Sequence, residues 1–97
     1  MIELSVDTHG VATLALARPE KHNALSQALI DALREAAAKI AADRAIRVVI
    51  LTGQGRSFCA GGDLGWMQDQ MAGDATMKRA AAHSIAQMLG AINTLPQ

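Results

Sequence analysis

The chain has 97 residues, of which 51% are hydrophobic and 19% are charged, and its nine basic side chains balance nine acidic ones. This composition is typical of one small globular domain and excludes a disordered or collagen-like chain. A net charge of zero provides no basic surface for nucleic acid or an anionic membrane. We therefore expect a small molecule or another protein as the partner.

The sequence also lacks the marks of a membrane or secreted protein. Its longest apolar runs fall far short of the ~20 residues that a membrane helix needs, and no signal-peptide pattern opens the chain. Cys59 is the only cysteine, which excludes an intrachain disulfide and a cysteine-based zinc site. We therefore expect a soluble, cytoplasmic protein that holds no metal.

The first half of the chain predicts a β-hairpin, a loop and a helix. Apolar residues alternate over 2–6 and again over 11–17, with a Thr-His-Gly turn between the two runs. The polar segment 18–23 contains a proline, which favours a loop because proline cannot donate a hydrogen bond to a sheet. From Ser26, a candidate N-cap, apolar residues recur at helical spacing as far as about Asp43.

The second half predicts one strand and two helices. The β-branched run at 47–52 is typical of a strand that is covered on both faces, as strands of parallel sheets are. Asp63 is a candidate N-cap for a short helix that continues to about Gln70. A longer helix follows Asp74 and ends at Pro96, with one apolar stripe made of Met77, Ala81, Ile85, Met88, Ile92 and Leu95.

These elements predict an α/β fold in which a strand, a helix and a second strand form the basic unit. The predicted sheet is incomplete, because the strand at 47–52 needs neighbours and cover that a hairpin and the helices do not supply. We therefore expect residues 1–97 to be the N-terminal portion of a larger domain, whose next strand would follow Gln97.

Most candidate motifs for chemistry fail on their spacing. Gly53-x-Gly55 follows a strand, but Phe58 stands where a dinucleotide-binding turn needs a third glycine, and the chain has no Walker-type Gly-Lys-Ser/Thr triplet. Cys59 has no base or cation beside it in the sequence, so we interpret it as a small packing residue. The three histidines lack metal-ligand spacing, and the acidic residues occupy positions typical of exposed turns and caps.

The segment 57–64, which is Ser-Phe-Cys-Ala-Gly-Gly-Asp-Leu, is different. Two glycines directly before a capped helix let the backbone approach a ligand closely, and the helix start presents free N–H groups that favour developing negative charge. The alternative interpretation is a tight turn between a strand and a helix. The residues by themselves leave both interpretations open.

Three segments, in this order along the chain, carry a resemblance to a known family. They are Arg18–Leu25 (RPEKHNAL), Val48–Gly53 (VVILTG) and Phe58–Leu64 (FCAGGDL). Together they closely resemble the enoyl-CoA hydratase/isomerase family, also called the crotonase family. The resemblance extends over essentially the entire chain, which is similar to the N-terminal third of a family member. It implies a truncated crotonase-like fold.

The resemblance implies a site for an acyl-CoA thioester, with coenzyme A as part of the substrate and no other cofactor. In the family, two backbone N–H groups bind the thioester oxygen and stabilise an enolate-like intermediate, and the first of them corresponds to Gly62. The residues that the resemblance places at the CoA moiety are Ala60, Asp63 and Leu64, through main-chain contacts, and Lys21, His22 and Ala24. The last three belong to a loop beside the pantetheine and the nucleotide.

The implied reaction is the addition of water across the 2,3 double bond of an enoyl-CoA, and the implied assembly is a homo-oligomer, a trimer or hexamer. The second N–H donor and two glutamates of the family's hydratases correspond to positions beyond Gln97. Residues 1–97 therefore do not determine the reaction type. An enoyl-CoA isomerase is one alternative, and a non-catalytic truncated paralogue or assembly module is another. We expect the isolated chain to be inactive.

Overall fold

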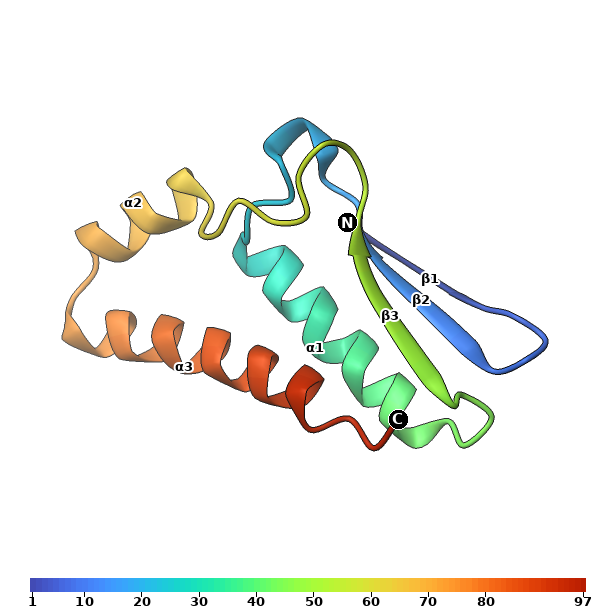
Figure 1. Ribbon diagram of the computed structural model, residues 1–97. Helices are drawn as coiled ribbons and strands as arrows, with labels where there is room; N and C mark the ends of the chain where they lie inside the picture. The colour runs from blue at the N-terminus through green and yellow to red at the C-terminus, as the bar shows by residue number, and fades with distance from the viewer.

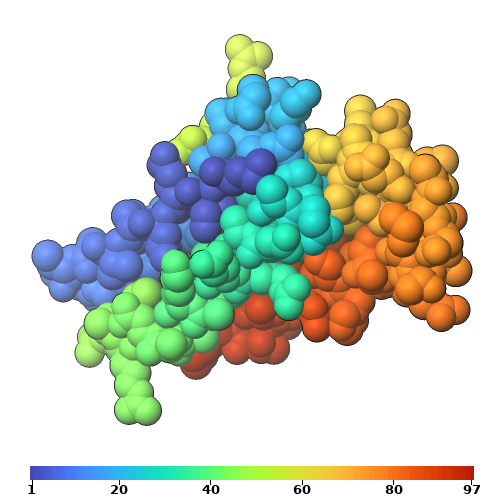
Figure 2. Space-filling view, turned by 180° about the vertical axis from the view of Figure 1, so that it is seen from behind, coloured from blue at the N-terminus to red at the C-terminus, as the bar shows by residue number.

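The sheet forms one layer of the structure, and the helices lie on one side of it (Figure 1). The computed structural model describes residues 1–97. Its elements in chain order are β1 (Ile2–Val6), β2 (Val11–Leu16), a 3-10 turn (Pro19–Lys21), α1 (Gln27–Ala42), β3 (Val48–Gly53), α2 (Leu64–Ala72) and α3 (Ala75–Asn93). The Cα atoms extend over 47 × 28 × 15 Å, and Figure 2 shows the long outline, with the β1–β2 turn at one end and α2 at the other.

β1 and β2 form the antiparallel hairpin that the alternation predicts. Leu4 lies opposite Leu14 at the centre of the pair. Asp7 closes the turn, because its side chain accepts hydrogen bonds from the N–H groups of His9 (2.8 Å) and Val11 (3.0 Å). The predicted hairpin is therefore confirmed, with its turn held by a local side chain.

α1 packs between the sheet and α3 and supplies more of the core than any other element (Figure 1). The Oγ atom of Ser26 accepts the N–H of Leu29 at 3.2 Å, and the helix ends with Asp43 as its C-cap, as predicted. The largest side chains that are essentially fully buried are Leu14, Leu29, Ile30, Ile40 and Met88. Each such aliphatic side chain contributes about 1.5–3 kcal/mol when it leaves water, so this layer stabilises the fold.

β3 pairs with β2 in parallel and lies at the edge of the sheet, in the order β1-β2-β3. The strand and its parallel pairing are confirmed, and one of its faces lacks the cover that its apolar pattern calls for, as expected of an incomplete sheet. Val48 and Ile50 are 50% and 49% exposed. They lie opposite Val11 and Thr13, on the face that carries no helix, because the helices pack on the other face (Figure 1).

α2 begins after Asp63, its predicted cap, and α3 begins after Asp74, where the longer helix was expected to start. The side chain of Asp63 accepts the N–H of Trp66, and that of Asp74 accepts the N–H of Met77, each at 2.9 Å. α3 ends at Asn93, so the helix terminates before the proline that was expected to end it. The ring of Pro96 clashes with a helical backbone at Leu95, the residue before it, which accounts for a helix end ahead of the proline.

The predicted apolar stripe of α3 is only partly buried. Ala81 and Met88 are buried, and Ile85 and Ile92 pack against the core, but Met77 is 53% exposed. Met77 lies in the first turn of α3, and the first turns of α3 extend beyond the N-terminal end of α1 (Figure 1). None of the helices combines the length and the apolar character that crossing a membrane would require.

Candidate functional site

The residues that the sequence analysis assigns to a ligand site come together around one cleft of about 610 Å³. This cleft lies between the loop that follows β2 and the start of α2. Its lining comprises Glu20, Lys21, His22, Ala24, Ala60, Gly62, Asp63, Leu64 and Gly65. All seven predicted site residues are in this set. Their proximity, across two separate segments of the chain, is what a shared ligand site requires.

Gly62 presents an unpaired backbone N–H at the cleft. It forms an isolated parallel β-bridge with Leu25, in which the N–H of Leu25 donates to the carbonyl of Gly61 at 2.6 Å and the N–H of Asp63 donates to the carbonyl of Leu25 at 2.9 Å. In such a bridge the N–H of the central residue points to the opposite side. The N–H of Gly62 donates to no group of the chain, so it is free to bind a ligand atom.

The two glycines of the motif differ in the reason why a side chain is disfavoured at each position. Gly61 has a φ of 92°, which side-chain-bearing residues rarely adopt, and a Cβ atom there would meet nothing within 4 Å. Gly62 is not in the left-handed region, but a Cβ atom there would lie 3.2 Å from Cγ and Sδ of Met67. The backbone conformation at position 61 therefore requires glycine. At position 62 a side chain is opposed only by the flexible side chain of Met67.

The Asp63 carboxylate is bonded to other residues of the protein, so only the backbone of Asp63 is available to a ligand in the cleft. One carboxylate oxygen accepts the N–H of Trp66 (2.9 Å) and the other forms an ion pair with Arg18 (3.2 Å). The hydrogen bond from Trp66 is the main cause that lowers the pKa of Asp63, and the Arg18 hydrogen bond and charge lower it further, against the opposing effect of burial. Asp63 is therefore an ionised helix cap and not a free general base.

Asn23 organises the loop that forms one wall of the cleft. Its side chain is completely buried, and its φ of 56° is left-handed. The side-chain oxygen accepts the N–H of Arg18 at 2.8 Å, and the amide nitrogen donates to the carbonyls of Gln54 and Ser57, both at 2.9 Å. One amide thus joins the segment after β2 to the segment after β3.

Arg18 makes the second connection between these segments. Its guanidinium donates to the carbonyl of Ala24 at 2.7 Å and to the carboxylate of Asp63 at 3.2 Å. Neither Arg18 nor Asn23 was among the predicted site residues. The available signals were slight: asparagine tolerates left-handed backbone, and an arginine directly after a strand that ends in a polar loop needs partners if it is not exposed.

Lys21 and His22 lie at the exposed rim of the cleft. The Nδ1 atom of His22 is 3.1 Å from the Oγ atom of Ser57, and the N–H of Ala60 donates to the carbonyl of His22 at 3.0 Å. These bonds keep the rim next to the glycine motif. Cys59 is half-buried and packs against the core, which confirms its interpretation as a packing residue.

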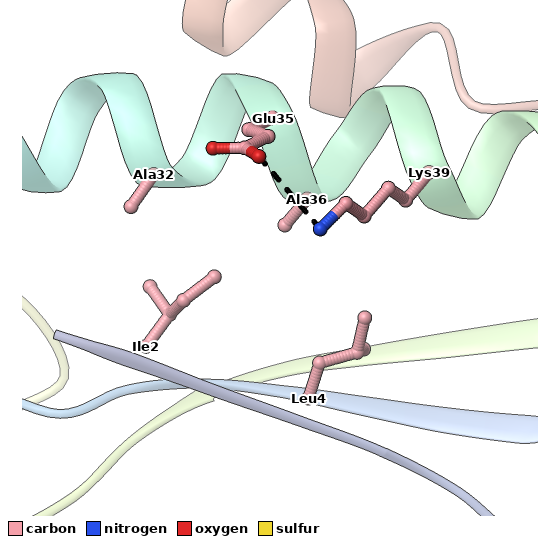
Figure 3. Close-up of a pocket in the computed structure, with 6 residues that line it drawn as sticks. All are labelled: Ile2, Leu4, Ala32, Glu35, Ala36 and Lys39. Atoms are coloured by element: carbon pink, nitrogen blue, oxygen red, sulfur yellow. Dashed lines mark ion pairs between the residues drawn. The ribbon is translucent and has the colours of Figure 1, made fainter.

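Two other hollows are lined by none of the seven predicted site residues. One of about 320 Å³ separates β1 from α1, where Ile2 and Leu4 point toward the helix beside the Glu35–Lys39 ion pair of 3.7 Å (Figure 3). The second, of about 480 Å³, is the α2–α3 groove, which is lined by Trp66, Met67, Gln70, Met71, Lys78, Ala81, Ala82 and Ile85. Met67 contacts both this mostly apolar groove and the position beside Gly62.

The arrangement matches one family of proteins. The family model described as enoyl-CoA hydratase/isomerase matches residues 7–95. The chain therefore belongs to the enoyl-CoA hydratase/isomerase family. An enoyl-CoA hydratase from Mycobacterium smegmatis superposes with a TM-score of 0.90 at 36% sequence identity, covering 98% of this chain and 36% of that one. The predicted fold, a truncated crotonase-like α/β fold, is confirmed.

Relatives of known sequence carry different activities in their names. A probable enoyl-CoA hydratase of Mycobacterium leprae is 55% identical over 58 residues, which cover 57% of this chain and 24% of that protein. The 1,2-epoxyphenylacetyl-CoA isomerase of Escherichia coli is 46% identical over 55 residues, which cover 57% of this chain and 21% of the isomerase. The chain thus matches between about a fifth and somewhat over a third of the length of these proteins. The names of these relatives agree on the family and differ in the reaction.

Proposed function

We propose that this chain is the acyl-CoA-binding part of an enoyl-CoA hydratase, in which the N–H of Gly62 binds the thioester oxygen. The observation that carries this proposal is the unpaired N–H of Gly62 in the cleft that brings all the predicted site residues together. A fixed backbone donor is suited to an oxygen that becomes negative during the reaction, because it needs no reorganisation at that moment.

The charges around Gly62 are compatible with that role. The ionised carboxylate of Asp63 is next to Gly62 and would oppose an enolate-like oxygen. The Arg18 guanidinium, 3.2 Å from that carboxylate, offsets its charge. The N-terminus of α2 begins directly after Asp63 and adds a favourable dipole. The Gly62 N–H therefore acts in a surrounding whose acidic group is already neutralised by a partner.

The two ends of the cleft suit the two ends of an acyl-CoA. Lys21 is exposed at the rim, where its charge would attract the phosphates of the nucleotide. On the other side, Met67 leads from Gly62 to the apolar α2–α3 groove, which would receive the acyl group. This placement puts the thioester carbonyl between the polar and apolar parts, next to Gly62.

Hydration requires acid and base groups that this chain does not place beside Gly62. Of the residues that line the cleft, only Glu20 and Asp63 are acidic. Glu20 is exposed and Asp63 is occupied by Trp66 and Arg18. We propose that the isolated chain binds acyl-CoA without hydrating it. An isomerase is the second candidate, since the relatives include an enzyme named as one.

Paired ligands test the role of the Gly62 N–H. Butyryl-CoA has the thioester oxygen, whereas S-butyl-CoA, a thioether of the same length, does not. We expect the chain to bind the thioester about three- to tenfold more tightly, which corresponds to one net hydrogen bond. Trp66 is the only tryptophan and lies in the α2–α3 groove, so its fluorescence can report binding of both ligands.

Two variants of Gly62 provide the control. Gly62→Pro removes the N–H, which donates to no group of the chain, and should abolish the preference for the thioester. Gly62→Ala keeps the N–H and should retain the preference, since only the flexible Met67 has to move. Equal affinities of the unmodified chain for the two ligands would refute the proposed binding of the thioester oxygen.

A further inference from the structure

Gln27, the first residue of α1, is hydrogen-bonded to α2 and α3 at once. The indole N–H of Trp66 in α2 donates to its Oε1 atom at 3.1 Å, and its Nε2 atom donates to the hydroxyl of Ser84 in α3 at 2.9 Å. The same nitrogen also donates to Asp31 one turn along α1, at 3.0 Å. A single side-chain amide thus joins all three helices.

α2 has little else that holds it to the rest of the chain. None of its residues is buried. The Trp66 indole makes the only hydrogen bond between an α2 side chain and another element. Only Trp66 of this helix packs against the hydrophobic core, and α2 is otherwise oriented by its ends and by its contact with α3. The Trp66 side chain, through its contact with the core and its bond to Gln27, is therefore the main lateral restraint on α2.

The orientation of α2 determines the surroundings of Gly62. The Trp66 backbone N–H is bonded to the side chain of Asp63, the residue after Gly62. A Cβ atom on Gly62 would lie 3.9 Å from Cε3 of Trp66 and 3.2 Å from Met67. A rotation of α2 that released the indole would therefore move the turn that contains the Gly62 N–H.

We propose that Gln27 is a positioning residue, which holds the Gly62 N–H in its binding orientation through the indole of Trp66. This inference rests on the proposed role of Gly62. Gln27 lies outside the cleft lining, so it acts through Trp66 and does not touch the ligand. The bond is exposed to solvent, so its effect is of the size of one ordinary hydrogen bond.

The test combines Gln27→Met with a matched change. Methionine has nearly the length of glutamine but cannot accept the indole N–H. Gln68→Met makes the same substitution at an exposed position of α2 that forms no side-chain hydrogen bond, and it serves as the control. Trp66→Phe removes the donor from the other side of the same bond, so it provides a second variant if Gln27→Met is poorly folded.

Two measurements separate positioning from stability. The single indole N–H signal of Trp66 in a proton–nitrogen NMR spectrum reports whether the bond to Gln27 is formed. Calorimetry gives the affinities for butyryl-CoA, S-butyl-CoA and free CoA. We expect Gln27→Met and Trp66→Phe to lower the thioester-to-thioether preference about three- to tenfold, with unchanged affinity for CoA, while Gln68→Met changes neither.

Different results overturn different statements. If the unmodified chain shows no preference for the thioester, the proposed role of Gly62 and this inference both fail. If the preference is present and is abolished in Gly62→Pro but persists in Gln27→Met after the indole signal has shifted, only the positioning role fails. An equal loss of affinity for all three ligands in Gln27→Met would also overturn it, since that pattern is expected of a merely structural residue.

Discussion

Replacing Asn23 by alanine tests whether one buried amide holds the two segments of the cleft together. The change removes three hydrogen bonds, to the N–H of Arg18 and to the carbonyls of Gln54 and Ser57. Each is worth about 0.5–1.5 kcal/mol net, so their loss should lower the free energy of unfolding by about 2–4 kcal/mol. Alanine also disfavours the left-handed φ of 56°, which adds to the loss.

Two further substitutions divide this loss into its parts. Asn23→Gly removes the same hydrogen bonds but tolerates the left-handed backbone, so it should be less destabilising than Asn23→Ala by about 1 kcal/mol. Asn23→Asp keeps an acceptor for Arg18 but directs a buried carboxylate at the carbonyls of Gln54 and Ser57. It should be at least as destabilising as alanine, because two acceptors then face a negative charge.

Urea unfolding followed by far-ultraviolet circular dichroism measures these differences. The midpoints should be determined at several protein concentrations, so that self-association does not enter the free energies. Asn23→Ala should also weaken the binding of butyryl-CoA, since one wall of the cleft depends on this amide. A loss of less than about 1 kcal/mol in Asn23→Ala would refute the reasoning, because three buried bonds cannot be removed at that cost.

The remaining predictions concern the two glycines, one carboxylate and the exposed strand. Gly61→Ala should lower the free energy of unfolding by about 1–2 kcal/mol because its φ is positive, and Gly62→Ala by much less; urea midpoints showing the reverse order would contradict this. The lowered pKa of Asp63 stabilises the fold above the unfolded pKa near 3.8, and this contribution is lost as the pH falls through the lower folded value. The stability difference between the unmodified chain and Asp63→Asn should therefore shrink as the pH falls from ~5 to ~3, and a difference that stays constant in pH-dependent unfolding would argue against it. The chain should self-associate through β3, so Ile50→Glu should shift sedimentation toward monomer and Ser5→Glu, on the same face of β1, should not; a strictly monomeric unmodified chain at micromolar concentration would exclude this.

Local chemistry made much of the fold predictable. The caps at Ser26, Asp63 and Asp74 are each made by a side chain and an N–H three residues later, so the sequence alone contains both partners. The alternation of the hairpin and the helical spacing of α1 are local in the same sense. The resemblance to the family supplied the grouping of Gly62 with the loop after β2, which the residues alone left open.

The parts that were missed depend on distant partners. The amide of Asn23 bonds a carbonyl 31 residues away, and Arg18 bonds a carboxylate 45 residues away. No pattern within either segment identifies these partners. Exposed apolar surface was expected of an incomplete sheet, but which residues of the α3 stripe are exposed depends on where whole elements lie, since Met77 and the buried Met88 share the same helical spacing.

On the face of the sheet that carries no helix, the two edge strands carry different kinds of side chain. Both β1 and β3 have an unpaired backbone edge, but on this face β1 carries Glu3 and Ser5, whereas β3 carries Val48 and Ile50. The Glu3 carboxylate also accepts a hydrogen bond from the side-chain amide of Gln54, at 2.8 Å. A polypeptide that joined at β3 would bury apolar surface and pair open hydrogen-bonding groups, while one at β1 would have to desolvate a charge. The apolar face of β3 is therefore better suited than that of β1 to continue the sheet.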